Sequence, residues 1–314
     1  MKRRAFTTLV TLAAATPILH ALAKERSHDL LLIHGRGQQG LDASTLKSDW
    51  LGALNRGLAA TGKGLPASIN VAFPYYGDVL DRFTKAYNIP LTSNIQARGS
   101  QDDDFLRFQA EFAQELQSQA GISDAQVEAE YGNDPQPRGP LNWKWVQAIL
   151  RAIDKHGHGM NQASLEIFTR DVYLYTTRAG VRDAIDAIVT KELTGRPTVI
   201  VAHSLGTVVA YSVLTRDTRA INVPLLVTVG SPLGVRAVRD QFVPLQSPPA
   251  VSAWYNAYDP RDVVALYALD GANFPVQPPV ENYSNVKNHT DNRHGIVGYL
   301  DDSKVAARIG SELG

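Results

Sequence analysis

Residues 199–214 read VIVAHSLGTVVAYSVL, an apolar run that is interrupted for a few residues and then resumes. The short continuous run at its start is typical of a buried parallel strand, and the run at its end is typical of a helix. A strand that leads directly into a helix makes a sharp turn at Ser204. Ala202 and Gly206 are both small enough to allow that turn. The stretch therefore predicts a strand, a tight turn that presents one serine, and a helix.

The alternation of strand and helix continues on both sides of this stretch. Apolar runs bounded by turn residues predict strands in HDLLLIHGRG, in SINVAFPYYGD around residues 69–73, in PLLVTVG and in VSAWYNAY. A helix is predicted over 178–193, where apolar residues recur on one face and Gly195 and Pro197 end the pattern. This alternation predicts an α/β fold with a mostly parallel sheet flanked by helices on both faces.

Residues 78 to about 168 do not fit the alternation. SQDDDFLRFQAEFAQELQSQAG predicts a helix with Ser100 as its N-cap. The apolar stripe of that helix comprises Phe105, Phe108, Phe112 and Leu116. NDPQPRGP predicts a loop, and LNWKWVQAILRAIDKHG predicts a second helix whose common face comprises Trp145, Ile149 and Ile153. Together they predict a helical cap inserted between strands, over the carboxyl ends of the sheet where such folds bind ligands.

Composition limits the classes of partner. The chain has 314 residues, 44% of them hydrophobic and 20% charged, which is enough for one large domain with a sizeable core. Its 31 Lys and Arg balance 31 Asp and Glu, so overall charge does not favour nucleic acid as a partner. Without cysteine there are no disulfides, thiol catalysis or cysteine metal sites. His156 and His158 have no third ligand at suitable spacing, so we predict a solvated loop there and no metal or cofactor. No feature indicates an oligomeric state.

The first residues resemble an export signal. MKRRAFTTLVTLAAATPILHALA starts with basic residues, continues with an apolar stretch and ends in small residues, which predicts a signal peptide over 1–23. Export to the periplasm or the medium follows. RRAF is also similar to a twin-arginine signal, although Lys2 stands where Ser or Thr is more usual, so that route is a further hypothesis. Cleavage would remove three basic residues and no acidic ones, leaving 28 minus 31, a net charge of −3. The apolar stretch is shorter than a spanning helix needs, and the mature chain has no other candidate.

The turn at Ser204 has the context in which a GxSxG nucleophile elbow works, because a strained turn lifts the hydroxyl above the sheet. A serine nucleophile needs a base, and the base needs an acid to orient it. With this elbow the order along the chain is Ser, Asp, His. NAYDPRDVVAL supplies two candidate acids, Asp259 and Asp262. NHTDNRHGIVGYL supplies two candidate bases, His289 and His294. The residues themselves leave both choices open.

These strings resemble the α/β hydrolases, with local similarity to the lipase-like members. The resemblance rests on LLIHGRG, VAHSLGT, VTVGSPLG and YDPRDVVAL with the later HGIVGYL, spread over roughly residues 29–300. Ala202 departs from the pattern, which has glycine there. The resemblance implies an α/β-hydrolase domain over 24–314 with the cap inserted at about 78–168; the inserted residues themselves match no pattern of the family.

The resemblance also selects among the candidates. In such enzymes the acid often directly precedes a short apolar pair, as Asp262 does. The histidine often stands a few residues ahead of a tyrosine, as His294 does of Tyr299. By this analogy the catalytic triad is Ser204, Asp262 and His294.

The charge that develops on a tetrahedral intermediate needs preorganised donors, which are usually backbone NH groups. Leu205, directly after the nucleophile, is expected to supply one. The second is expected from the loop after the first strand, HGRG, with the NH of Arg36 preferred and that of Gly37 next. The loop lacks the spacing of a phosphate-binding motif. His34 and His203 flank this region and are expected to shape it through hydrogen bonds.

These residues predict an exported serine hydrolase that cleaves carboxylic esters through an acyl-enzyme. The same triad would serve a lipid-directed lipase or phospholipase, an amidase or peptidase, or an acyltransferase. A binding protein that kept the fold and lost the chemistry is the alternative of a different class, and a complete Ser, Asp and His set argues against it. The expected partner is a small-molecule or lipid ester.

Overall fold

The protein is described by a computed structural model that covers residues 29–95, 102–157 and 159–313. The predicted signal peptide, Ser100 and His158 lie outside these residues. Six strands form one open sheet in the order β2-β1-β3-β4-β5-β6, and every neighbouring pair is parallel. The strands are β1 (Asp29–Ile33), β2 (Val71–Ala72), β3 (Thr198–His203), β4 (Leu226–Val229), β5 (Trp254–Ala257) and β6 (Glu281–Tyr283).

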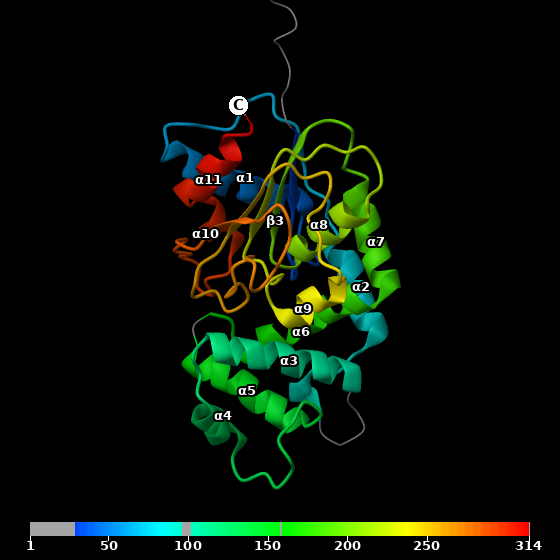
Figure 1. Cartoon of the computed structure of the whole chain (residues 1–314), viewed down its shortest axis with the longest axis vertical. Coiled ribbons are helices and arrows are strands. Elements are labelled where there is room, and N and C mark those ends of the chain that lie inside the picture. The colour runs from blue at the N-terminus through cyan, green and yellow to red at the C-terminus, as the bar shows by residue number, and fades with distance from the viewer. Residues whose placement is uncertain (1–28, 96–101, 158, 314) are drawn as a thin grey trace, which may run out of the picture.

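Helices cover both faces of the sheet and one end of it (Figure 1). The helices before β3 are α1 (Ala43–Ala59), α2 (Gly77–Tyr87), α3 (Asp103–Gln119), α4 (Asp124–Tyr131), α5 (Trp143–His156), α6 (Gln162–Thr177) and α7 (Ala179–Thr190). Those after it are α8 (Leu205–Arg216), α9 (Arg236–Arg239), α10 (Ile296–Leu300) and α11 (Ser303–Gly310). Short 3₁₀ turns occur at η2 (Thr92–Asn94) and η3 (Asp240–Phe242).

The alternation of side chains along β3 divides the core in two. Val199 and Val201 pack with residues of α1, α10 and α11 on one face. Ile200 and Ala202 point to the other face and pack with α7 and α8. All four side chains are fully buried, so the strand is apolar throughout, as a central parallel strand must be. The predicted α/β fold with helices on both faces is confirmed.

The order of the strands places a crevice between β1 and β3. The chain moves from β1 outward to β2, and then returns to the opposite side of β1 to form β3. Loops that leave the carboxyl ends of two such strands diverge, and open α/β sheets bind their ligands at this point. The loop after β1 and the turn at Ser204 are the two loops concerned.

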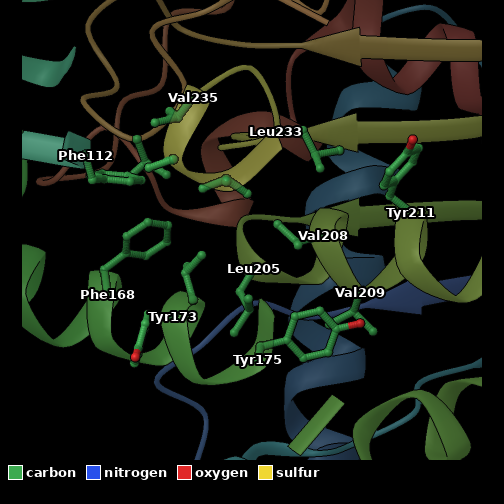
Figure 2. Packing of buried hydrophobic residues seen from close by; sticks show 14 of the residues in the cluster. Phe112, Phe168, Tyr173, Tyr175, Leu205, Val208, Val209, Tyr211, Leu233 and Val235 are labelled. Carbon is green, nitrogen blue, oxygen red and sulfur yellow. The ribbon is translucent and has the colours of Figure 1, made fainter. Parts of the chain in front are cut away.

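Helices α3 to α6 form a separate layer beyond the carboxyl ends of the strands, at the end of the molecule opposite the C-terminus (Figure 1). The predicted stripe of α3 is buried there. In Figure 2, Phe112 of α3 and Phe168 of α6 belong to the same packed cluster as Leu205 of α8. The layer is therefore joined to the sheet domain by a continuous apolar core.

Several elements differ from the sequence prediction. Helix α3 begins at Asp103, and the side chain of Asp102, not Ser100, caps it by accepting a hydrogen bond from the amide of Phe105. Strand β2 is only two residues long, because Pro74 has no NH to continue the ladder. Strand β6 and seven helices were not predicted: α1, α2, α4, α6, α9, α10 and α11. Among the described residues no helix has both the length and the apolar character needed to span a membrane.

Candidate active site

Ser204 occupies the turn between β3 and α8. Its backbone angles are φ 56° and ψ −129°, a conformation that non-glycine residues rarely adopt. Strain of this kind costs about 1–3 kcal/mol and persists only where the surrounding structure enforces it. Here β3 and α8 are both buried and fix the chain on either side of the turn.

Ser204, His294 and Asp262 form one hydrogen-bonded line. His294 Nε2 lies 2.8 Å from Ser204 Oγ, and His294 Nδ1 lies 2.6 Å from Asp262 Oδ2. The three residues come from the turn after β3, the loop before α10 and the loop after β5. All three are buried. With a proton on Nδ1, the imidazole can accept the serine proton at Nε2, which is the arrangement that activates a hydroxyl.

Asp262 is held in place by two further donors. Its Oδ1 accepts a hydrogen bond from the amide of Val264, and Tyr299 Oη donates to Oδ2 at 2.6 Å. Burial and the nearby carboxylate charge raise the pKa of Tyr299 well above its ordinary value, so the phenol remains a donor at neutral pH. The carboxylate is therefore fully satisfied while it orients His294.

The other acid and the other histidine are engaged elsewhere. The two oxygens of Asp259 accept hydrogen bonds from the amides of Arg261 and Asn288. His289 lies on the surface, where its Nε2 is 2.8 Å from Asp301 Oδ2. Asp259 supports the loop that carries His294, and neither Asp259 nor His289 is hydrogen-bonded to Ser204 or His294 in the structure.

The loop after β1 lies against the serine. A Cβ built on Gly35 would be 2.8 Å from Ser204 Cβ, so only glycine permits this approach. Leu205 is the first residue of α8, and its amide therefore has no partner within the helix. In the part of the chain that the structure describes, the amides of Arg36, Gly37 and Leu205 donate to no other protein group. The loop after β1 and the first residue of α8 thus each provide backbone NH groups near the nucleophile that are free to bind an oxyanion.

His34 and His203 are neutral and make structural hydrogen bonds. His34 Nδ1 donates to the backbone oxygen of Gly35, and its Nε2 accepts from the amide of Tyr76. His203 Nε2 donates to the backbone oxygen of His294 at 2.7 Å. Burial lowers the pKa of His34 to about 4 and that of His203 well below its ordinary value. Both uncharged side chains therefore hold the neighbouring backbone of the site in place through hydrogen bonds.

The triad opens into a cleft of about 350 Å³ between the loop after β1 and the loop before α10. The apolar residues that line it are Leu46, Trp50, Met160, Ile296 and Val297. Cavities of about 410 Å³ and 540 Å³ lie beside the loop before α5 and between α7 and α8. Neither of these contains a nucleophile paired with a base, so geometry and not size identifies the cleft beside Ser204 as the candidate site.

Two contacts of the site were not expected from the sequence. Arg36 Nε donates to Asp171 Oδ2 at 2.9 Å, which joins the loop after β1 to helix α6. Tyr76 donates both its amide and its hydroxyl to His34. No local pattern marks either residue, because each contact joins segments far apart along the chain. Among the described residues, no three His, Asp or Glu side chains gather as metal ligands would.

No family model matches the chain, and no curated protein matches it.

The buried His34 predicts a loss of stability in acid. Because its pKa falls from 6.5 in the unfolded chain to about 4 in the fold, the unfolded state binds the proton first as pH falls. The stability that neutral His34 contributes is complete above pH 6.5. As the pH falls toward 4, the free energy of unfolding decreases by about 3 kcal/mol. Urea unfolding at pH 7 and pH 4.5 should show this loss in the wild type.

His34→Gln is the matched variant, because glutamine retains a donor and an acceptor but takes up no proton. Its unfolding free energy should depend less on pH than that of the wild type. Since His203 titrates in the same direction in both proteins, the difference isolates His34. Equal pH dependence in the two proteins would contradict the assignment.

Proposed function

We propose that the chain is a serine hydrolase of the α/β-hydrolase kind that cleaves carboxylic esters. The observation that carries the proposal is the line from Asp262 through His294 to a serine held in a strained turn. A serine that served only to pack the core would not need the strained turn, since an ordinary backbone conformation would bury it equally well. Export is proposed with it, on residues 1–23 alone.

The proposed reaction follows from the order of the hydrogen-bonded groups, Ser204, His294 and Asp262. Ser204 Oγ attacks the acyl carbon while His294 Nε2 takes the hydroxyl proton, and Asp262 stabilises the imidazolium that results. The oxyanion forms beside the amides of Leu205 and Arg36, with Gly37 next to them. His294 then returns the proton to the leaving alcohol. Water attacks the acyl-enzyme by the same route and releases the acid, and Ser204 regains its proton.

Labelling by a fluorophosphonate probe tests the proposal. The probe reacts with a serine only when a base activates it, so the mature protein should be labelled at Ser204, and mass spectrometry of the modified peptide should identify the site. Ser204→Ala should abolish the label. Ser231→Ala is the control, because Ser231 is equally buried just after the neighbouring strand β4 but is paired with Thr207 Oγ1 and not with a histidine.

Label that survives in Ser204→Ala, or a folded wild type that neither takes the label nor hydrolyses soluble esters, would refute the proposal. Once label is established, rates on a soluble ester, the matching amide and an aggregated ester distinguish the substrate classes. We expect the soluble ester to react without activation by aggregates. Strong activation would instead indicate a lipid substrate.

A further inference from the structure

Asp171 is a buried carboxylate on α6, in the helical layer and not in the sheet domain. Only 4% of the residue is exposed. Its Oδ2 accepts from Arg36 Nε at 2.9 Å, and Arg170 reaches its Oδ1 at 3.3 Å. Both arginine side chains are largely buried as well. A buried carboxylate of this kind is retained only with charged partners, because leaving it unpaired would cost several kcal/mol.

The partner of Asp171 belongs to the loop proposed to bind the oxyanion. Arg36 uses its side chain for the ion pair, while the residue lines the cleft and its backbone amide donates to no other group of the described chain. The backbone oxygen of Arg36 accepts a hydrogen bond from Gln38, so the residue is also fixed along the loop. Restraint of the guanidinium therefore restrains the peptide plane that carries the proposed donor.

The same face of α6 contacts the other half of the site. Phe168 precedes Asp171 by three residues, so the two side chains share a helix face. The Phe168 and His294 rings form a T-shaped contact, with centroids 6.4 Å apart and planes at 86°. Figure 2 shows Phe168 turned from α6 into the cluster that includes Leu205. One face of α6 thus contacts both the base and the loop of the proposed oxyanion hole.

We infer that Asp171 is a positioning residue, which acts through Arg36 to hold the loop of residues 35–37 in the geometry that binds the oxyanion. The inference rests on the proposed function. On this inference, α6 is a permanent part of the active site and not a lid that opens and closes over it. Loss of the carboxylate charge should loosen the loop and weaken binding of the transition state more than binding of the substrate.

The test compares Asp171→Asn with the wild type on a soluble ester. We expect kcat to fall about 10- to 100-fold while KM changes less than about threefold, since one donor of an oxyanion hole contributes about 10²–10³ in kcat. Hydrogen exchange of peptides that cover residues 34–40 should become faster. Asp183→Asn is the control, because Asp183 pairs with Arg216 at the exposed surface of α7, away from the cleft. It should change neither readout.

Arg36→Gln breaks the same ion pair by changing its more exposed member. This variant replaces Asp171→Asn in the test if Asp171→Asn does not fold. Its kcat should fall by a similar factor, and the double variant should be no slower than the slower single one, because both changes remove one interaction. Unchanged kcat in Asp171→Asn, additive losses in the double variant, or unchanged exchange in the loop would overturn the inference. A folded wild type that neither takes the label at Ser204 nor hydrolyses soluble esters would refute the proposed function instead, and the exchange rates alone would then decide whether Asp171 holds the loop.

Discussion

Asp262→Asn should lower kcat for ester hydrolysis about 10⁴-fold while the protein remains folded. The amide of Val264 donates to Oδ1 of Asp262, so the oxygen of an asparagine would stay at that position. The new NH₂ group would then face His294 and donate to Nδ1. The histidine proton would move to Nε2, where it prevents the ring from accepting the proton of Ser204. Steady-state kinetics together with a thermal unfolding curve measure both parts of this expectation.

Asp259→Asn is the discriminating control, because the sequence offered Asp259 as the second candidate acid. Both of its oxygens accept backbone NH groups, and an asparagine would lose one of these buried hydrogen bonds. We expect a cost of about 1–3 kcal/mol in stability and a loss of less than about tenfold in kcat. If Asp259→Asn removed activity and Asp262→Asn did not, the acid would have been assigned to the wrong residue.

The elbow and the sheet could be predicted because their signals are local. A continuous apolar run, small residues around Ser204 and a following helix pattern all lie within the sixteen residues first quoted. The choice between two acids and two histidines is different in kind, since both members of each pair lie in loops of similar composition. It depends on which oxygens the backbone already uses, as in Asp259, and on a surface partner such as Asp301 for His289.

Helix α6 and its contribution to the site gave no such signal. Ten of its sixteen residues are buried, so it has no polar stripe to reveal a helical period. The partner of Asp171 is 135 residues away along the chain, and one sequence does not show that they meet. The N-cap of α3 was predicted two residues early for a simpler reason. Ser100 and Asp102 are both good caps, and the choice depends on where the preceding chain leaves the helix.

Gly206→Ala should lower the free energy of unfolding by about 3 kcal/mol and reduce kcat with it. A Cβ on Gly206 would lie 2.4 Å from the backbone oxygen of Ile33 and 2.5 Å from that of His34. These atoms belong to the end of β1 and its loop, so no side chain can rotate to make room. Either β1 or the first turn of α8 must shift. Urea unfolding and steady-state kinetics measure the two effects.

Gly180→Ala makes the same chemical change in α7, where nothing lies within 4 Å of the new Cβ. There the helix should gain about 0.5–1 kcal/mol, because alanine loses less backbone entropy than glycine on folding. The two variants should therefore change the free energy of unfolding in opposite directions, which separates the effect of crowding from the intrinsic helix preference of alanine. In Gly206→Ala the shift would also move the amide of Leu205 relative to the loop of Arg36, so kcat should fall even under conditions where the variant is fully folded. A stable Gly206→Ala with wild-type kcat would mean that β1 and α8 tolerate separation, and that the proposed oxyanion hole does not depend on their close contact.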